Sequence, residues 1–171
     1  AIAVIEMGAN HQKEIEGYCH YTQPTHGLIT NCGKAHLEGF GGLEGVRLGK
    51  TEMYKHLITE DKLIFFNENE DTLQVSLPNY KNVYKYGKQN VELLSNQSST
   101  NGCLHIEVKV DEHIYTIQTQ LFGLYNVQNV LTALAVGKYL NVPMNDAVQA
   151  IEAYVPQNNR SQISQSKNGN A

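Results

Sequence analysis

The sequence predicts an α/β fold, with a mostly parallel sheet flanked by helices and an antiparallel β-hairpin as a subregion. Three observations lead to this prediction. Apolar runs alternate with helical patterns up to about Asn67, two later segments alternate apolar and polar residues around a short turn, and the last periodic stretch is helical. Alternating strands and helices imply βαβ crossovers and a parallel sheet, whereas a short turn between alternating segments implies an antiparallel pair.

The first block, up to about Asn67, supplies the parallel sheet. Its N-terminal run, Ala1-Ile2-Ala3-Val4-Ile5, is continuously apolar, as in a strand with both faces buried, and predicts a strand over residues 2–6. Further strands are predicted over residues 27–31 and 62–66, and helices over residues 13–21 and 42–57.

The second and third blocks supply the hairpin and two helices. Cys103 to Val110 and Tyr115 to Leu121 alternate apolar and polar residues, and Asp111-Glu112-His113 joins them as a turn. A helix is predicted over residues 126–140, and another after Pro143, because apolar residues recur one helical turn apart. The apolar positions are Val127, Val130, Leu131 and Leu134 in the first helix, and Met144, Val148, Ile151 and Val155 in the second.

Length, charge and cysteine content limit the function. A chain of 171 residues fits one domain, and its net charge of −4 without any basic run argues against binding to nucleic acid. No apolar stretch approaches the ~20 residues of a membrane-spanning helix, so membrane insertion is not predicted. The three cysteines include no C-x-x-C pair, which indicates reduced thiols and a cytoplasmic protein.

The two ends of the sequence predict a piece of a longer protein. The chain opens inside a predicted strand without an initiator methionine. It closes on a polar tail over residues 157–171, in which only Ile163 and the terminal alanine are apolar.

Two predicted strand exits carry side chains that can bind a metal. Glu6 directly follows the first strand, and the loop after the strand over residues 27–31 holds His36 and Glu38. The carboxyl edge of a parallel sheet is where ligands bind in open α/β folds, and carboxylate and imidazole are both metal ligands. Glu6 or His36 alone is more commonly structural, but their shared placement makes a joint site as well supported as two separate structural roles.

Lys50 interrupts the apolar stripe of the helix predicted over residues 42–57. The stripe runs through Val46 and Met53, and Lys50 occupies the position between them. On periodicity alone, the commoner outcome is that the lysine extends its ammonium group to the rim. The alternative is that the amine is held in a low-dielectric site and becomes reactive.

Two other patterns resemble known sites only in part. The stretch from Gly45 to Thr51 is one residue short of a phosphate-binding P-loop, because Glu44 stands where a glycine is needed, and no buried strand precedes it. Cys32 and His36 have the spacing of half a zinc site, but no second Cys/His pair of suitable spacing exists.

Two asparagines lie one helical turn apart at the start of a predicted helix. The ordinary explanation for Asn126 is that it is the N-cap residue. Asn129 lies inside the helix, where asparagine is unfavourable, so it requires another reason.

Five motifs resemble, in order and spacing, the central domain of the Mur ligases. The resemblance covers Ile2 to Arg160, and the wording of the first and third motifs is closest to ligases that add D-alanyl-D-alanine. The motifs are Glu6-Met7-Gly8-Ala9-Asn10-His11, Thr30-Asn31, Ala35-His36-Leu37-Glu38-Gly39-Phe40-Gly41, Gly49-Lys50-Thr51-Glu52-Met53 and Gly123-Leu124-Tyr125-Asn126-Val127-Gln128-Asn129.

The resemblance implies an ATP-dependent amide ligase of peptidoglycan synthesis. In such a reaction, ATP phosphorylates the terminal carboxylate of UDP-N-acetylmuramoyl-tripeptide, and the amine of D-alanyl-D-alanine attacks the acyl phosphate. The products are the pentapeptide, ADP and phosphate. Two alternatives stay open: a related amide ligase that acts on another acid, and a non-catalytic module that binds a metal or a nucleotide.

The resemblance also implies roles for individual residues. Glu6 and His36 would bind two Mg²⁺ ions, and Lys50 would be carbamylated and help to hold the second ion. Asn129, with Asn126, would contact the adenine of ATP. Arg160 would reach the nucleotide, although Ser161-Gln162 follows it where many relatives have an apolar residue and a glutamate.

The resemblance further implies how the chain is organised. Residues 1–160 would be a central ATPase domain that is truncated before its P-loop, and residues 161–171 would be a polar tail leading to a missing C-terminal domain. An N-terminal UDP-binding domain would also be missing. Because the P-loop would hold the phosphates of ATP, we expect the isolated chain to be inactive.

Overall fold

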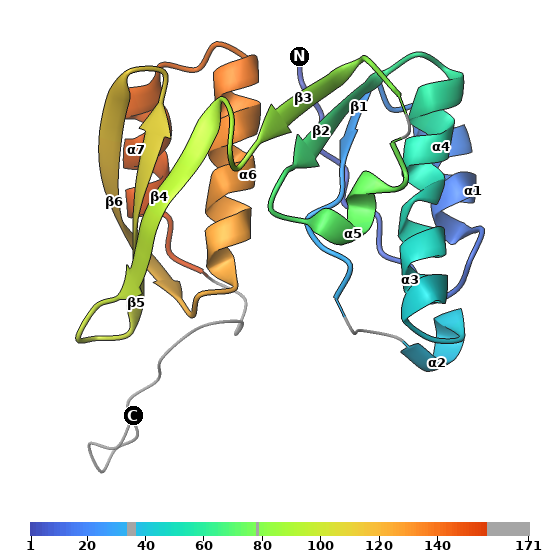
Figure 1. Ribbon diagram of the computed structural model, residues 1–171, viewed down its shortest axis with the longest axis horizontal. Coiled ribbons are helices and arrows are strands. Elements are labelled where there is room, and N and C mark those ends of the chain that lie inside the picture. The colour runs from blue at the N-terminus through green and yellow to red at the C-terminus, as the bar shows by residue number, and fades with distance from the viewer. Residues whose placement is uncertain (34–36, 78, 157–171) are drawn as a thin grey trace. The chain divides into compact units, whose positions relative to one another are not determined.

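The chain folds into two compact units of mixed α/β structure (Figure 1). A computed structural model describes residues 1–33, 37–77 and 79–156. One unit comprises Ala1–Lys85 and the other begins at Tyr86, and each is described by itself. The predicted fold class is confirmed, because one sheet contains a parallel pair of strands and the other sheet is antiparallel.

The first unit is built on a three-stranded sheet. Its strands are β1 (His26–Leu28), β2 (Leu63–Asn67) and β3 (Val83–Tyr86), in the order β1-β2-β3. β1 and β2 are parallel, with Gly27 opposite Ile64, which confirms the strands predicted in these two places.

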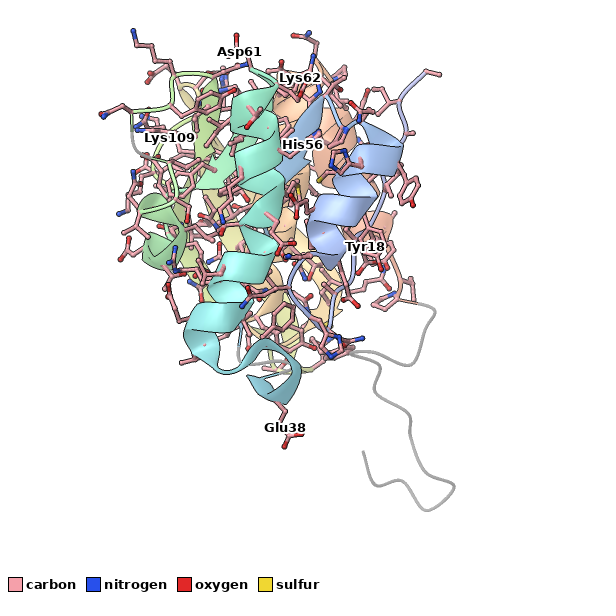
Figure 2. All side chains as sticks on the ribbon, turned by 90° about the vertical axis from the view of Figure 1, so that its right-hand side faces the viewer. Tyr18, Glu38, His56, Asp61, Lys62 and Lys109 are labelled. Carbon is pink, nitrogen blue, oxygen red and sulfur yellow. The ribbon has the colours of Figure 1, made fainter. Side chains whose placement is uncertain are left out.

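Helices pack beside this sheet, and one of them, α4 (Glu52–Thr59), contacts it directly. The other helices are α1 (Glu14–Thr22), α2 (Leu37–Phe40), α3 (Leu43–Lys50) and α5 (Asp71–Gln74). Figure 2 shows α1 and α4 side by side, and α4 also contacts β1 and β2. The buried core of the unit gathers Ile29, Tyr54, Leu57, Ile64, Phe66, Leu73 and Leu77.

The helix predicted over residues 42–57 is divided at Thr51. The backbone there has φ −76° and ψ 0°, so its ψ departs from the α-helical value. The Thr51 N–H nevertheless donates to Arg47 O, and the Lys55 N–H donates to Thr51 O. Both bonds join residues four apart, as in an α-helix, so the helical hydrogen bonding continues from α3 into α4.

The strand predicted over residues 2–6 is wrong. Residues 1–9 form no strand, and Ile2 and Val4 are 71% and 91% exposed. An apolar run becomes a strand only where a neighbouring strand accepts and donates its backbone hydrogen bonds. Within the described residues, no segment pairs with this run.

The second unit holds the antiparallel sheet. Its strands are β4 (Val91–Ser98), β5 (Cys103–Val110) and β6 (His113–Phe122), in the order β4-β5-β6. The predicted hairpin is confirmed by β5 and β6, in which Ile106 lies opposite Ile117. Asp111 at the turn has a left-handed φ of 54°, which aspartate tolerates better than most residues.

Two helices pack against this sheet. They are α6 (Asn126–Tyr139) and α7 (Met144–Ala153), and both predicted helices are therefore confirmed. Val155, which was predicted to lie on the second helix, follows its end. Buried residues of this unit include Leu104, Ile106, Ile117, Leu131 and Leu134. Within the described parts of the chain, no helix is long and apolar enough to cross a membrane.

Candidate functional site

The predicted site residues lie in several different elements. Glu6 is exposed in the segment before α1, and Lys50 is the last residue of α3. Asn126 and Asn129 lie in the first turn of α6. His36 and Arg160 are outside the described residues, so the predictions for these two side chains remain untested.

The motif that contains Glu6 contacts the motif that contains His36. Gly39 lies so close to the first motif that a Cβ atom there would overlap the Asn10 carbonyl oxygen. Only glycine permits a backbone approach of this kind. The segment after Glu6 and the loop after β1 are therefore held together at Asn10 and Gly39.

The next contact joins the His36 motif to α3. Phe40 ends α2, and its carbonyl oxygen would overlap a Cβ atom at Gly45. The Phe40 ring is buried against Gly49 at the other end of α3. These close approaches set the position of α3, and hence of Lys50, relative to α2.

Glu38, which shares the loop and helix with His36, is not part of this contact network. Figure 2 shows its side chain extending from α2 away from the body of the unit. The residue is exposed.

Glu52 has a structural role that the sequence pattern did not reveal. From the start of α4, its carboxylate accepts the Lys13 N–H at 2.6 Å and the Glu16 N–H at 3.1 Å. It thereby satisfies N–H groups at the start of α1, as an N-cap side chain does. Local sequence carries no signal of this role, because the capped helix lies 36 to 39 residues earlier in the chain.

Glu14 orders the backbone that follows Gly8. Its carboxylate accepts the Asn10 N–H at 2.7 Å and the His11 N–H at 3.1 Å. These backbone hydrogen bonds, first that of Asn10 and then that of His11, lower the pKa of Glu14. The carboxylate therefore stabilises this conformation of the first motif when it is ionised.

Lys50 reaches the segment that follows β1. Its Nζ donates to the carbonyl oxygen of Asn31 at 2.7 Å, and the residue is half-buried. Among the described residues, no carboxylate lies within ion-pair distance of this amine. The hydrogen bond connects the Lys50 motif with the Thr30-Asn31 motif, so four of the five motifs form one connected network in the first unit.

Cys32, next to Asn31, is a half-buried free thiol. Burial raises its pKa, and the positive charges of Lys50 and Arg47 offset only part of that effect. Within the described residues, no three His, Cys, Asp or Glu side chains come together as a metal site. A zinc site at Cys32 therefore gains no support from the geometry.

Asn126 and Asn129 are hydrogen-bonded to each other at the start of α6. Asn126 is buried, and its Nδ2 donates to the Phe122 carbonyl oxygen at 2.8 Å. The Asn129 Nδ2 donates to Asn126 Oδ1 at 3.0 Å, and Asn129 itself is exposed. Asn126 was predicted to be the N-cap, but Tyr125 is in that position and Asn126 bonds backwards to the end of β6.

Comparison with protein families and relatives gives a consistent result. A family model described as the Mur ligase middle domain matches residues 1–137. The UDP-N-acetylmuramoyl-tripeptide–D-alanyl-D-alanine ligase of Haemophilus influenzae is 34% identical over 156 residues, covering 88% of this chain and 33% of the relative. The Escherichia coli ligase of the same name is 33% identical over 159 residues, covering 86% of this chain and 33% of the relative.

Solved structures are similar over nearly the whole chain. MurF from Acinetobacter baumannii has a TM-score of 0.81 at 25% identity, covering 94% of this chain and 36% of that one. MurF from Thermotoga maritima in complex with ADP has a TM-score of 0.78 at 21% identity, covering 94% and 38%, which shows the shared fold. The chain spans about a third of the length of the curated relatives that it matches.

Proposed function

This chain belongs to the Mur ligase family, and from that premise we propose that it is the ATP-using part of a D-alanyl-D-alanine-adding ligase. The observation that carries the proposal is the match along most of the chain to two relatives with that activity in their names. The contacts among four of the motifs support the proposal. Segments that are far apart in sequence come together there, as the parts of one binding site must.

The proposed reaction forms an amide bond at the expense of ATP. The γ-phosphoryl group is transferred to the terminal carboxylate of UDP-N-acetylmuramoyl-tripeptide, and ADP leaves. The amine of D-alanyl-D-alanine then attacks the acyl carbon, and inorganic phosphate leaves with one of the carboxylate oxygens. Phosphoryl transfer of this kind depends mainly on positioning and on neutralising negative charge.

Lys50 is the residue that we propose to be carbamylated. Its half-buried amine has a backbone acceptor and, within the described residues, no carboxylate partner that would occupy it. Addition of carbon dioxide to the amine would place a carboxylate near the carboxyl end of β1. That edge of a parallel sheet is where ligands bind in open α/β folds.

Glu6 and His36 complete the proposed metal ligands. The Glu6 carboxylate is exposed and forms no hydrogen bond with the described residues, so its oxygens are available to a cation. Mg²⁺ is typically bound by one or two protein carboxylates, with phosphate and water as its other ligands. When bound, magnesium would neutralise charge on the transferred phosphoryl group.

Asn129 is the proposed contact for the adenine base, with Asn126 behind it, and Arg160 is a further proposed contact for the nucleotide. Asn129 suits this role because its amide is exposed and is oriented by Asn126. The ADP bound to the Thermotoga maritima relative is consistent with nucleotide binding by this fold. A cytoplasmic location and the extent of the central domain, residues 1–160, belong to the same proposal.

The test is product formation by the full-length protein that contains this chain. It is incubated with ATP, Mg²⁺, UDP-N-acetylmuramoyl-tripeptide and D-alanyl-D-alanine, and the products are analysed by mass spectrometry. We expect the UDP-linked pentapeptide, with no product when any one substrate is omitted. A product with a different amino acid but not with D-alanyl-D-alanine would identify a related ligase, and ATP binding without any product would identify a non-catalytic module.

A further inference from the structure

We propose that Asn126 is a positioning residue that fixes the orientation of the Asn129 amide, and thereby makes the site prefer adenine to purines with an oxygen at position 6. This inference rests on the proposed nucleotide contact at Asn129. It gives Asn126 a role beyond the adenine contact that the resemblance implies, because Asn126 acts through the amide of Asn129.

The first step is that Asn126 can take only one amide orientation. Its Nδ2 donates to the Phe122 carbonyl oxygen at 2.8 Å, and a backbone carbonyl can only accept a hydrogen bond. Turning the amide by 180° would place Oδ1 against this carbonyl oxygen and lose the bond. Asn126 is only 6% exposed, so water would not readily compensate for the loss.

The second step is that Asn126 imposes an orientation on Asn129. Because Asn126 Oδ1 faces Asn129 and can only accept, Asn129 must present its Nδ2, and it does so at 3.0 Å. An exposed asparagine without such a partner could reverse its amide at little cost. Asn129 instead keeps one N–H bonded inward, and its Oδ1 and second N–H stay available on its exposed side.

The third step concerns the edge of the base. Adenine has an amino group at position 6 that donates hydrogen bonds. The ring nitrogens on its two sides, N7 and N1, both accept. An asparagine amide can therefore bind either edge, the N7 edge or the N1 edge, with two hydrogen bonds. Hypoxanthine, the base of ITP, has an accepting oxygen at position 6 and a donating N1–H. On the N1 edge, it needs the reverse amide orientation. On the N7 edge, hypoxanthine presents two acceptors, and neither amide orientation can bind both, so the proposal places the Asn129 amide against the N1 edge. There, an amide fixed in one orientation favours ATP over ITP.

The experiment compares two substitutions of Asn126 in the full-length protein. In Asn126→Leu, the orienting acceptor is lost, so Asn129 can reverse. In Asn126→Asp, the carboxylate still accepts from Asn129 but cannot donate to Phe122 O. We expect Asn126→Leu to lower the ratio of ATP to ITP affinity by about tenfold, and Asn126→Asp to retain most of that ratio. Asn145→Ala, at an exposed asparagine near the start of α7, is the control and should bind both nucleotides as the wild type does.

A second readout does not depend on ligand binding or activity. Hydrogen exchange of the Asn129 side-chain amide, followed by NMR after selective ¹⁵N-asparagine labelling, should be slow for one of its two protons. It should become fast for both protons in Asn126→Leu. This measurement also separates an altered side chain from a protein that has failed to fold, because the other asparagine signals keep their positions.

The outcomes separate this inference from the proposed function. If both Asn126 variants bind more weakly but keep the wild-type ratio of ATP to ITP affinity, Asn126 is merely structural and the inference is overturned. If the two variants lose the ratio equally, the orienting role of the acceptor is also overturned. If wild type and Asn129→Ala bind ATP equally well, the proposed nucleotide contact at Asn129 fails first.

Discussion

The amine of Lys50 donates a hydrogen bond to Asn31 O in the segment that follows β1, and this placement leads to the first prediction. In the full-length protein, Lys50→Ala should lower the turnover number by about a hundredfold or more, because it removes the proposed carbamate. Added formate or acetate should partly restore turnover by supplying a carboxylate. Lys55→Ala, at an exposed lysine of α4, is the matched control and should retain activity. Loss of activity without rescue, together with no carbamate signal in ¹³C NMR, would count against the proposed role of Lys50.

Glu14 leads to a prediction about pH. Its pKa is lowered by the hydrogen bonds from the Asn10 and His11 amides, so ionised Glu14 stabilises the folded form. Because the folded pKa lies below the unfolded one, this stabilisation is complete above the unfolded pKa and is lost as pH falls through the folded pKa. The amide protons of Asn10 and His11 should shift in NMR spectra over that acidic range. In Glu14→Gln the shift should disappear, and an unchanged titration would show that another group causes it.

At the scale of elements, the approach of α2 to α3 depends on a glycine. A Cβ atom at Gly45 would overlap the Phe40 carbonyl oxygen, so Gly45→Ala should destabilise the protein by about 1–3 kcal/mol. Gly17, inside α1, has nothing within 4 Å of a Cβ atom, so Gly17→Ala should stabilise the protein by about 0.5–1 kcal/mol. Urea denaturation of the two variants and the wild type measures both effects. Equal stability of the two variants would mean that the contact between α2 and α3 does not restrict Gly45.

Elements with their own periodicity could be predicted from the sequence. α1, α6 and α7 each present an apolar face, and β5 and β6 alternate around a short turn, so their positions follow from local pattern. β4 has no such alternation after Leu93, and its last five residues are exposed, so it exists as a strand because it pairs with β5. The run over residues 2–6 shows the converse, since apolar residues alone do not make a strand without a partner.

At the scale of the whole molecule, the site could be predicted only in part. The motifs identified Lys50 and the two asparagines, and the structure adds their hydrogen-bond partners. Lys50 donates to Asn31 O, Asn129 donates to Asn126 Oδ1, and Asn126 donates to Phe122 O. Glu52 could not be assigned a role from local sequence, because it caps a helix that lies far away in the chain. Long-range hydrogen bonds of this kind depend on tertiary structure and leave no periodic signal.

The isolated chain should fold but should not turn over ATP. The two units have buried cores, whereas the sequence contains no P-loop to hold the β- and γ-phosphates. A phosphate-release assay with ATP, Mg²⁺, UDP-N-acetylmuramoyl-tripeptide and D-alanyl-D-alanine compares the chain with the full-length protein. Comparable turnover by both would mean that the active site needs nothing outside this chain.

Transfer of an oxygen atom tests the central claim most directly, because only activation of the carboxylate by phosphorylation moves that atom into phosphate. UDP-N-acetylmuramoyl-tripeptide labelled with ¹⁸O in its terminal carboxylate is converted by the full-length protein with ATP and D-alanyl-D-alanine. The phosphate released is then examined by ³¹P NMR or mass spectrometry. An ATP-dependent ligase acting through an acyl phosphate should release one phosphate carrying one ¹⁸O atom for each amide bond formed. Amide formation with unlabelled phosphate, or with the label in AMP, would contradict this account.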